Sequence, residues 1–153
     1  MGRVAPPSFQ ITGLTTFCLV AMAACVPHSG TEPNTADVSG SWSFTESFAD
    51  LVHGISCADT GTYQLVQSGT AFSGTYRQSG VCHIDQGGVD NSDQGMVTKG
   101  QMIGRTLKFQ APNCSYAGAL DEASLTSISG QMTCVLQDST RRFDFAGVWK
   151  ASR

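Results

Sequence analysis

From Asp37 to the end of the chain, apolar and polar residues alternate in short runs with the period of two that is typical of β-strands. Glycine, asparagine, aspartate and serine separate the runs and favour turns between them. No run has a helical period, although residues 48–55 would fit one helical turn. The pattern predicts strands over residues 38–47, 60–67, 71–78, 81–85, 95–101, 104–110, 113–120, 126–137 and 142–151.

A five-residue pattern recurs within these runs: an apolar residue, a small residue, glycine, any residue, and a large apolar residue. It occurs at residues 38–42, 72–76, 128–132 and 145–149. Because strand side chains alternate between two faces, the glycine and both apolar residues share one face. Glycine there leaves room for large neighbours and lets the strand bend, although turn glycines are the alternative interpretation. The pattern favours an all-β fold, a single antiparallel up-and-down β-barrel of about eight strands.

The apolar positions also fix the register of two hairpins. A two-residue turn at residues 69–70, with glycine first as a type II′ turn requires, sets Tyr63 opposite Tyr76. The same register brings Cys57 opposite Cys82. The first predicted disulfide therefore joins Cys57 to Cys82.

The second hairpin lies near the C-terminal end of the predicted barrel. The alternation of its apolar residues sets Tyr116 opposite Met132. The same register sets Cys114 opposite Cys134. Four cysteines allow three connectivities, and only one of them closes two local loops. We therefore expect Cys114 to pair with Cys134.

The residues before Asp37 have a different character. After Arg3, residues 11–24 form an apolar segment that is too short to span a bilayer and is typical of a signal peptide. Residues 25–36 are mostly polar, with two prolines, and favour a flexible tether in which His28 is solvated. We expect a signal peptide at 1–24, a tether at 25–36 and the barrel at 37–153.

The end of that apolar segment, Met22-Ala23-Ala24-Cys25, resembles the lipobox of bacterial lipoproteins. The resemblance implies lipid attachment at Cys25 and a membrane-anchored protein of the bacterial cell envelope. Val26 is not the aspartate that resembles an inner-membrane retention signal, so the outer membrane is favoured. Because Met22 stands where leucine is usual, ordinary cleavage and secretion is the alternative.

Composition agrees with export. Of the six cysteines, Cys18 lies in the predicted signal peptide, so an even set of four remains once Cys25 carries lipid. Charged residues make up 14% of the chain, against about 25% in an average domain. With a net charge of −3, the chain offers no basic face for nucleic acid and no polybasic membrane patch.

The first predicted strand opens with Gly40-Ser41-Trp42, which resembles the Gly-x-Trp signature of lipocalins. The repeated Ser-Gly-Thr-Tyr style is also similar to avidin-like and other small calycin barrels. In lipocalins the tryptophan packs beneath a basic residue, and the candidates for that residue here are Arg141, Arg142 and Arg153. The resemblance implies a lipocalin-like barrel and the binding of small apolar ligands.

The barrel interior decides between two functions, because eight strands enclose just enough space for packed side chains or one small ligand. One function is a membrane-tethered binding protein for a small apolar or amphipathic molecule. The alternative is an interaction or inhibitor protein with a filled core, whose loops bind an envelope or host protein. The aromatic candidates for ligand contact are Trp42, Tyr63, Tyr76, Tyr116 and Trp149.

Catalytic motifs are absent from the sequence. It contains no Gly-x-Ser-x-Gly motif, and a catalytic triad would require His53 or His83 beside a buried aspartate. We therefore expect neither an enzyme nor a cofactor.

Oxygen-bearing side chains gather between His83 and Gly95. Aligned as an EF-hand from Asp90, this loop has glycine at its sixth position, but Gln101 replaces the bidentate glutamate. The sequence favours a solvated hairpin loop over residues 85–95, with a Ca²⁺ site as the alternative.

Overall fold

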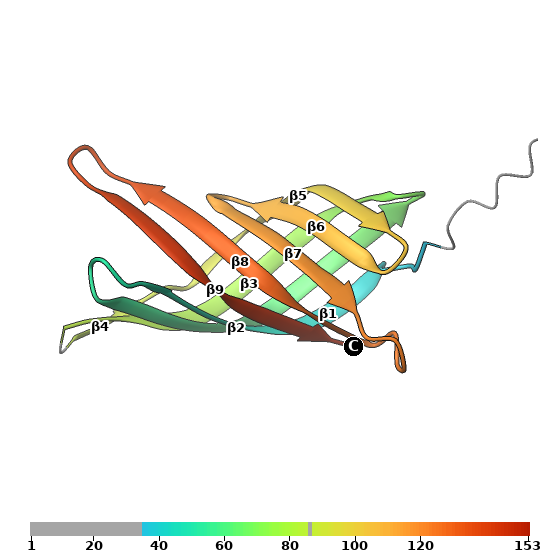
Figure 1. The fold of residues 1–153 in the computed structure, drawn as a ribbon, viewed down its shortest axis with the longest axis horizontal. Helices are drawn as coiled ribbons and strands as arrows, with labels where there is room; N and C mark the ends of the chain where they lie inside the picture. Colours follow the sequence, from blue (N-terminus) through green and yellow to red (C-terminus); the bar gives the residue numbers. More distant parts are fainter. Residues whose placement is uncertain (1–34, 86) are drawn as a thin grey trace, which may run out of the picture. The chain divides into compact units, whose positions relative to one another are not determined.

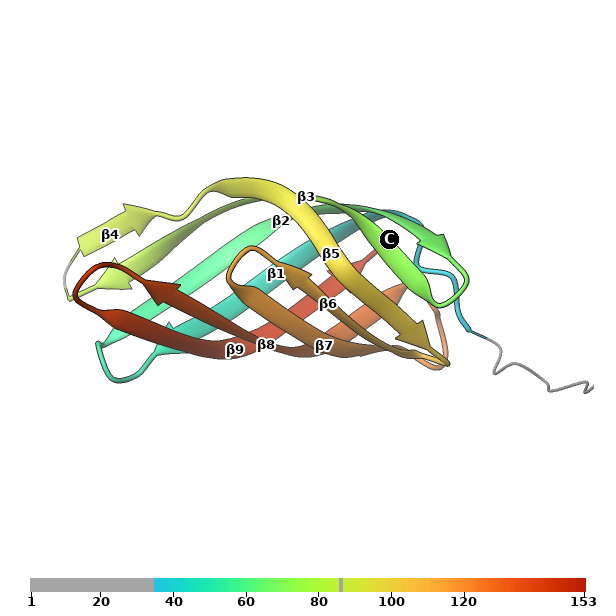
Figure 2. The same ribbon diagram turned by 90° about the horizontal axis from the view of Figure 1, so that it is seen from above.

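The computed structural model describes residues 35–85 and 87–153, which form a closed antiparallel β-barrel of eight strands with one additional short strand (Figures 1 and 2). The predicted signal peptide, Cys25 and the tether up to residue 34 lie outside the described residues. None of the described residues forms a helix long and apolar enough to cross a membrane.

The barrel strands pair with their neighbours along the chain, and β1 pairs with β9 to close the sheet. The extra strand, β4, pairs only with the far end of β3, so β3 is followed in the barrel by β5. The prediction of an all-β, up-and-down barrel of about eight strands is confirmed. The strands are β1 (Gly40–Asp50), β2 (Ile55–Ser68), β3 (Ala71–Ile84), β4 (Gly87–Asp90), β5 (Asp93–Ile103), β6 (Thr106–Ala111), β7 (Cys114–Leu120), β8 (Ser127–Gln137) and β9 (Arg142–Ser152).

Strands β2 and β3 are longer than predicted. Their register runs unbroken from Ser68 opposite Ala71 to Ile55 opposite Ile84, so β3 is one strand where the sequence predicted two. The polar residues 78–80 interrupt the apolar pattern, but the pairing with β2 carries the strand through them. The helical turn considered for residues 48–55 is instead the end of β1, a four-residue turn and the start of β2.

Both predicted hairpin registers are present. Tyr63 lies opposite Tyr76 and Cys57 opposite Cys82, after a turn in which Gly69 has a φ of 60°. In the second hairpin, Tyr116 lies opposite Met132 and Cys114 opposite Cys134. The two disulfides, Cys57–Cys82 and Cys114–Cys134, are the pairs that the registers predict.

The recurring glycines explain how closely the strands pack. A Cβ atom at Gly74 would lie 2.0 Å from the carbonyl oxygen of Gln64, and one at Gly130 would lie 2.0 Å from that of Ala117. Backbone cannot move aside cheaply, so these positions require glycine. Gly40 differs, because it has open space around it and a φ of 114°, a conformation that other residues rarely adopt.

One end of the barrel, here called the closed end, is covered by the residues that lead into β1. Ala36 donates from its backbone to Gly104 in the β5–β6 turn and accepts from Gln67 in β2, so this segment crosses the barrel end. It buries Trp42 completely, with the indole nitrogen donating to Val38. The apolar residues packed there are Val38, Trp42, Leu65, Phe72, Met102, Leu107, Leu120, Ile128 and Ala151.

Above Trp42 lies the basic residue that the lipocalin resemblance implies. The guanidinium of Arg153 is centred 4.6 Å from the indole ring and donates to the backbone oxygens of Ser39 and Asp37. Of the three arginines considered, Arg153 therefore occupies this position, while Arg141 and Arg142 pair with acids on the β8–β9 hairpin.

Aromatic side chains fill the middle of the barrel. Phe109 stacks on Tyr116 with ring centroids 4.5 Å apart, and Phe44 stacks on Tyr63 at 4.2 Å. Trp149 meets Tyr63, Phe109 and Tyr116 edge to face. The middle of the barrel is thus a packed core.

Candidate functional site

The end opposite the closed end holds a cavity of about 310 Å³, here called the mouth. Both disulfides contribute to its wall, and its lining residues come from every strand except β6 and from the turns between strands. Its lining is mixed, with apolar side chains on one part and amides, hydroxyls and carboxylates on another. The lining residues are Glu46, Phe48, Cys57, Gln78, Cys82, Asp90, Asn91, Ser92, Asp93, Pro112, Asn113, Cys114, Tyr116, Met132, Cys134, Leu136 and Phe145.

Glu46 is the most buried charged residue in this lining. It occupies an inward position of β1 and is 5% exposed. Its two carboxylate oxygens accept hydrogen bonds from the hydroxyls of Tyr63, at 2.9 Å, and Tyr116, at 3.3 Å. Burial raises the pKa of Glu46 from 4.5 to about 7; the nearby charge of Asp59 adds to the rise and the tyrosine hydrogen bonds oppose it. Glu46 therefore changes its charge near neutral pH.

Asp59, on an inward position of β2, lies close behind the wall of the mouth and is 2% exposed. Its Oδ2 accepts hydrogen bonds from the side-chain amides of Gln78, at 3.0 Å, and Asn91, at 2.7 Å, and both of these residues line the mouth. Its Oδ1 has no hydrogen-bond partner among the described residues and packs against Gly80. Burial raises the pKa of Asp59.

Hydroxyl groups of three tyrosines donate hydrogen bonds to Glu46 or to Asp93, which both line the mouth. Tyr63 and Tyr116 bind Glu46, and the hydroxyl of Tyr76 donates to Asp93 at 2.5 Å. Burial, together with the neighbouring carboxylates, raises the pKa of all three phenols. The phenols therefore stay protonated and serve as hydrogen-bond donors.

The mouth carries acidic side chains without basic ones. Glu46, Asp90 and Asp93 line it, and no lysine, arginine or histidine does so among the described residues. Residues 35–85 and 87–153 contain no group of three or more His, Cys, Asp or Glu side chains placed to hold a metal ion.

The structure separates the five aromatic residues that the sequence analysis assigned to ligand contact. Tyr116 lines the mouth, and Tyr63 and Tyr76 lie beside it through their bonds to Glu46 and Asp93. Trp42 is packed at the closed end. Trp149 belongs to the packed core, where its indole nitrogen donates to the backbone oxygen of Gln131.

Sequence reasoning missed Glu46 and Asp59, the two buried carboxylates at the mouth. Every second side chain of β1 faces inward, and Glu46 follows Trp42 and Phe44 in that series. Asp59 follows Cys57 in the corresponding series of β2. A charged residue among the apolar, inward-facing positions of a strand was the feature of the sequence that could have indicated this site.

The stretch predicted as a solvated hairpin loop is mostly exposed where it is described, but residues 87–90 form β4 and β5 begins at Asp93. Asn91 and Asp93 bond to Asp59 and Tyr76.

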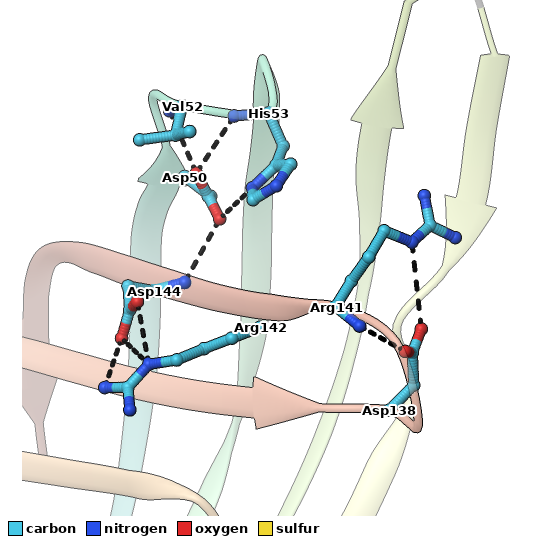
Figure 3. A network of polar contacts seen from close by, with 7 residues as sticks. All are labelled: Asp50, Val52, His53, Asp138, Arg141, Arg142 and Asp144. Carbon is cyan, nitrogen blue, oxygen red and sulfur yellow. Dashed lines mark hydrogen bonds and ion pairs between the residues drawn. The ribbon is translucent and has the colours of Figure 1, made fainter.

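A second polar network closes the β1–β2 turn at the same end (Figure 3). The buried Asp50 accepts hydrogen bonds from the backbone of Val52, His53 and Asp144 and, at 2.8 Å, from the His53 ring. Burial alone would raise the pKa of Asp50, but these hydrogen bonds outweigh it and leave the pKa lowered. The network ties the turn to β9.

This aspartate and histidine pair meets part of the requirement for a catalytic triad. In the described part of the chain, however, no serine hydroxyl is hydrogen-bonded to His53, whose ring instead packs on Phe143 with centroids 4.8 Å apart. In this geometry, Asp50 and His53 stabilise the β1–β2 turn.

The hairpin tips around the mouth expose apolar side chains. Leu51 and Val52, in the β1–β2 turn, are 91% and 88% exposed. Ile84, Val89 and Leu136, from the β3–β4 and β8–β9 hairpins, are also exposed. We call these five side chains the rim.

No protein-family model matches the chain, and a search of curated proteins found no match. Among solved structures, the chain is similar to the S-type phycobiliprotein lyase CPES from Guillardia theta, with a TM-score of 0.44 and 9% identity. That comparison covers 76% of this chain and 88% of the lyase. Function has to be argued from the site itself.

Proposed function

We propose that this chain is an exported binding protein that holds a small amphipathic molecule in the mouth of its barrel. The observation that carries the proposal is the cavity of about 310 Å³, which is large enough for a small ligand. Phe48, Met132 and Phe145 offer an apolar wall, and Glu46 and Tyr116 offer polar contacts. An amphipathic molecule fits such a lining better than a purely apolar one.

The packed core limits where the ligand sits. Phe109, Tyr116 and Trp149 occupy the middle of the barrel, so a long apolar chain has no deep channel to enter. The ligand is therefore short or only partly enclosed.

Native mass spectrometry of the full chain, purified gently, tests this function. We expect a small-molecule adduct that Leu136→Trp reduces by about tenfold, because the indole would fill the mouth from its rim. Ile103→Trp is the matched control, since Ile103 is an exposed apolar residue outside the mouth. A clean apo mass for the unsubstituted chain would contradict the proposal.

Export and tethering form the second part of the proposal. Two disulfides are typical of proteins in oxidising compartments outside the cytoplasm. The lipobox resemblance at Met22-Ala23-Ala24-Cys25 supports lipid attachment at Cys25 and a place in the bacterial envelope. Mass analysis of the mature N-terminus should find a lipidated Cys25, and an unmodified chain starting at Ala24 would instead indicate secretion.

The rim favours a second candidate function, the binding of an envelope or host protein through the hairpin tips. Exposed leucine and valine side chains around one opening are typical of interaction surfaces. Cross-linking in intact envelopes distinguishes the two functions. If Leu51→Ser with Val52→Ser abolishes a protein cross-link but leaves the small-molecule adduct intact, the rim and not the cavity binds the protein partner.

A further inference from the structure

The three buried carboxylates of the described barrel differ in how well they are satisfied. Asp50 accepts four hydrogen bonds, one of them from a histidine ring. Glu46 accepts two, both from neutral phenols, and Asp59 accepts two on one oxygen and none on the other. A buried carboxylate is costly unless it is paired with a positive charge or fully hydrogen-bonded. Glu46 and Asp59 therefore have neither a basic side chain as partner nor the four hydrogen bonds that Asp50 accepts.

None of the described side chains supplies a basic partner at the mouth. The lining residues include three acids and, within the described parts of the chain, no basic residue. Glu46 itself faces the cavity and uses two of the roughly four acceptor positions of a carboxylate. Free acceptor capacity thus points into a space that a small molecule can enter.

Asp59 does not line the mouth, but its charge acts on it from behind the wall. Its unpartnered Oδ1 is buried beside Gly80, while Gln78 and Asn91 stand between its Oδ2 and the cavity. A charge at this depth is weakly screened, so it adds negative potential to the mouth without contacting a ligand.

Asp93 adds a third carboxylate nearer the opening, where the hydroxyl of Tyr76 holds it.

We propose that the ligand of the mouth is a small molecule with a protonated amine on an apolar body, and that its ammonium group binds the carboxylate of Glu46. This inference rests on the proposed function and names the chemical class of its ligand. The ammonium donates hydrogen bonds to the free acceptor positions of Glu46. The apolar body packs on Phe48, Met132 and Phe145, which form the apolar part of the wall.

Calorimetric titration of the full chain with three probes of equal length tests the inference: octylamine, octanol and octanoate. At about pH 8 octylamine is protonated, octanol is neutral and octanoate is an anion. We expect octylamine to bind at least about tenfold more tightly than octanol, and octanoate to bind most weakly. Equal binding of octylamine and octanol would overturn the cationic ligand and leave the small-molecule site standing. If none of the three binds, the proposed function fails along with the inference.

Substitution of Glu46 tests its role directly. Glu46→Gln keeps the shape of the side chain and should lower octylamine affinity by about tenfold, while octanol binding stays within about twofold. Unchanged octanol binding shows that the mouth is intact in the variant. Glu122→Gln is the control, because Glu122 is an exposed acid near the closed end and outside the cavity lining. Unchanged octylamine affinity in Glu46→Gln would overturn the assignment of the ammonium to Glu46.

Discussion

At the closed end, the residues that lead into β1, here called the lead-in segment, cross the end of the barrel. Trp42 is completely buried there beneath Arg153. At the mouth, the space that such a segment would fill is open, and carboxylates and amides share the lining with apolar side chains. Both disulfides lie at this second end, and all four cysteines belong to the lining of the mouth.

The difference shows two ways of holding a barrel together. The closed end is stabilised by burial of a large aromatic residue and its apolar neighbours. The mouth has a cavity and a partly polar lining in place of that burial, and covalent bonds between adjacent strands hold it. Apolar burial and covalent bonds thus stabilise opposite ends of one sheet.

The largest expected effect is at the closed end. Trp42→Ala should lower the free energy of unfolding by about 4 kcal/mol, because it leaves a large cavity in a packed region. Phe48→Ala, at the wall of the mouth, should cost less, since the change enlarges a space already open to water. Urea denaturation measures both. An equal or greater loss for Phe48→Ala would contradict the contrast between the ends.

Removal of one disulfide should weaken the mouth selectively. The bond between Cys114 and Cys134 closes a loop with a sequence separation of 20, so replacing both cysteines by alanine should cost about 3 kcal/mol. Hydrogen exchange should show the loss of protection first at the ends of β7 and β8 nearest the mouth. Equal loss of protection at both ends of these strands would show that the bond does not act locally.

The charge of Glu46 predicts a pH dependence. Its pKa is about 7 in the folded chain and about 4.5 when unfolded, so the folded state binds the extra proton between these values. Stability from this group is therefore present below about pH 4.5 and is lost as the pH rises through 7. The groups facing it are Tyr63, Tyr116, Tyr76 and Asp59.

Glu46→Gln removes this dependence. At about pH 8 it should stabilise the chain by roughly 2 to 3 kcal/mol, because the uncharged amide avoids the cost of a buried carboxylate. The gain should disappear near pH 4.5. Thermal unfolding across this pH range measures it, and a gain that is constant with pH would show that charge is not its cause.

The smallest effect concerns Arg153. Arg153→Ala should cost about 1 kcal/mol, since an exposed guanidinium over an indole and two hydrogen bonds to backbone oxygens contribute modestly. Ligand binding at the mouth should not change. Weakened octylamine binding in this variant would show that the two ends are coupled.

The sequence was sufficient to predict the hairpin registers, because a two-residue turn at Gly69 fixes every later pair in its hairpin. It could not choose among three arginines for the place above Trp42, since that contact depends on where the strands end in space. Strand β4 was missed because Gly87 and Gly88 give it no alternation of apolar and polar residues.

The mouth was harder to predict than the fold. Its lining comes from eight strands and the turns between them, so no local spacing reveals it. Asn91 and Asp93 look like loop residues in the sequence, yet they bond to Asp59 and Tyr76 from neighbouring parts of the sheet. The sequence pointed to the mouth in one way only: Glu46 and Asp59 are charged residues at strand positions whose side chains face the barrel interior.

The path of the lead-in segment has a mechanical consequence. Because Ala36 is bonded to β2 and to the β5–β6 turn, a force applied upstream of it is delivered to the best-packed part of the barrel. Tension applied there would therefore load Trp42 and its neighbours before it reaches the hairpins around the mouth.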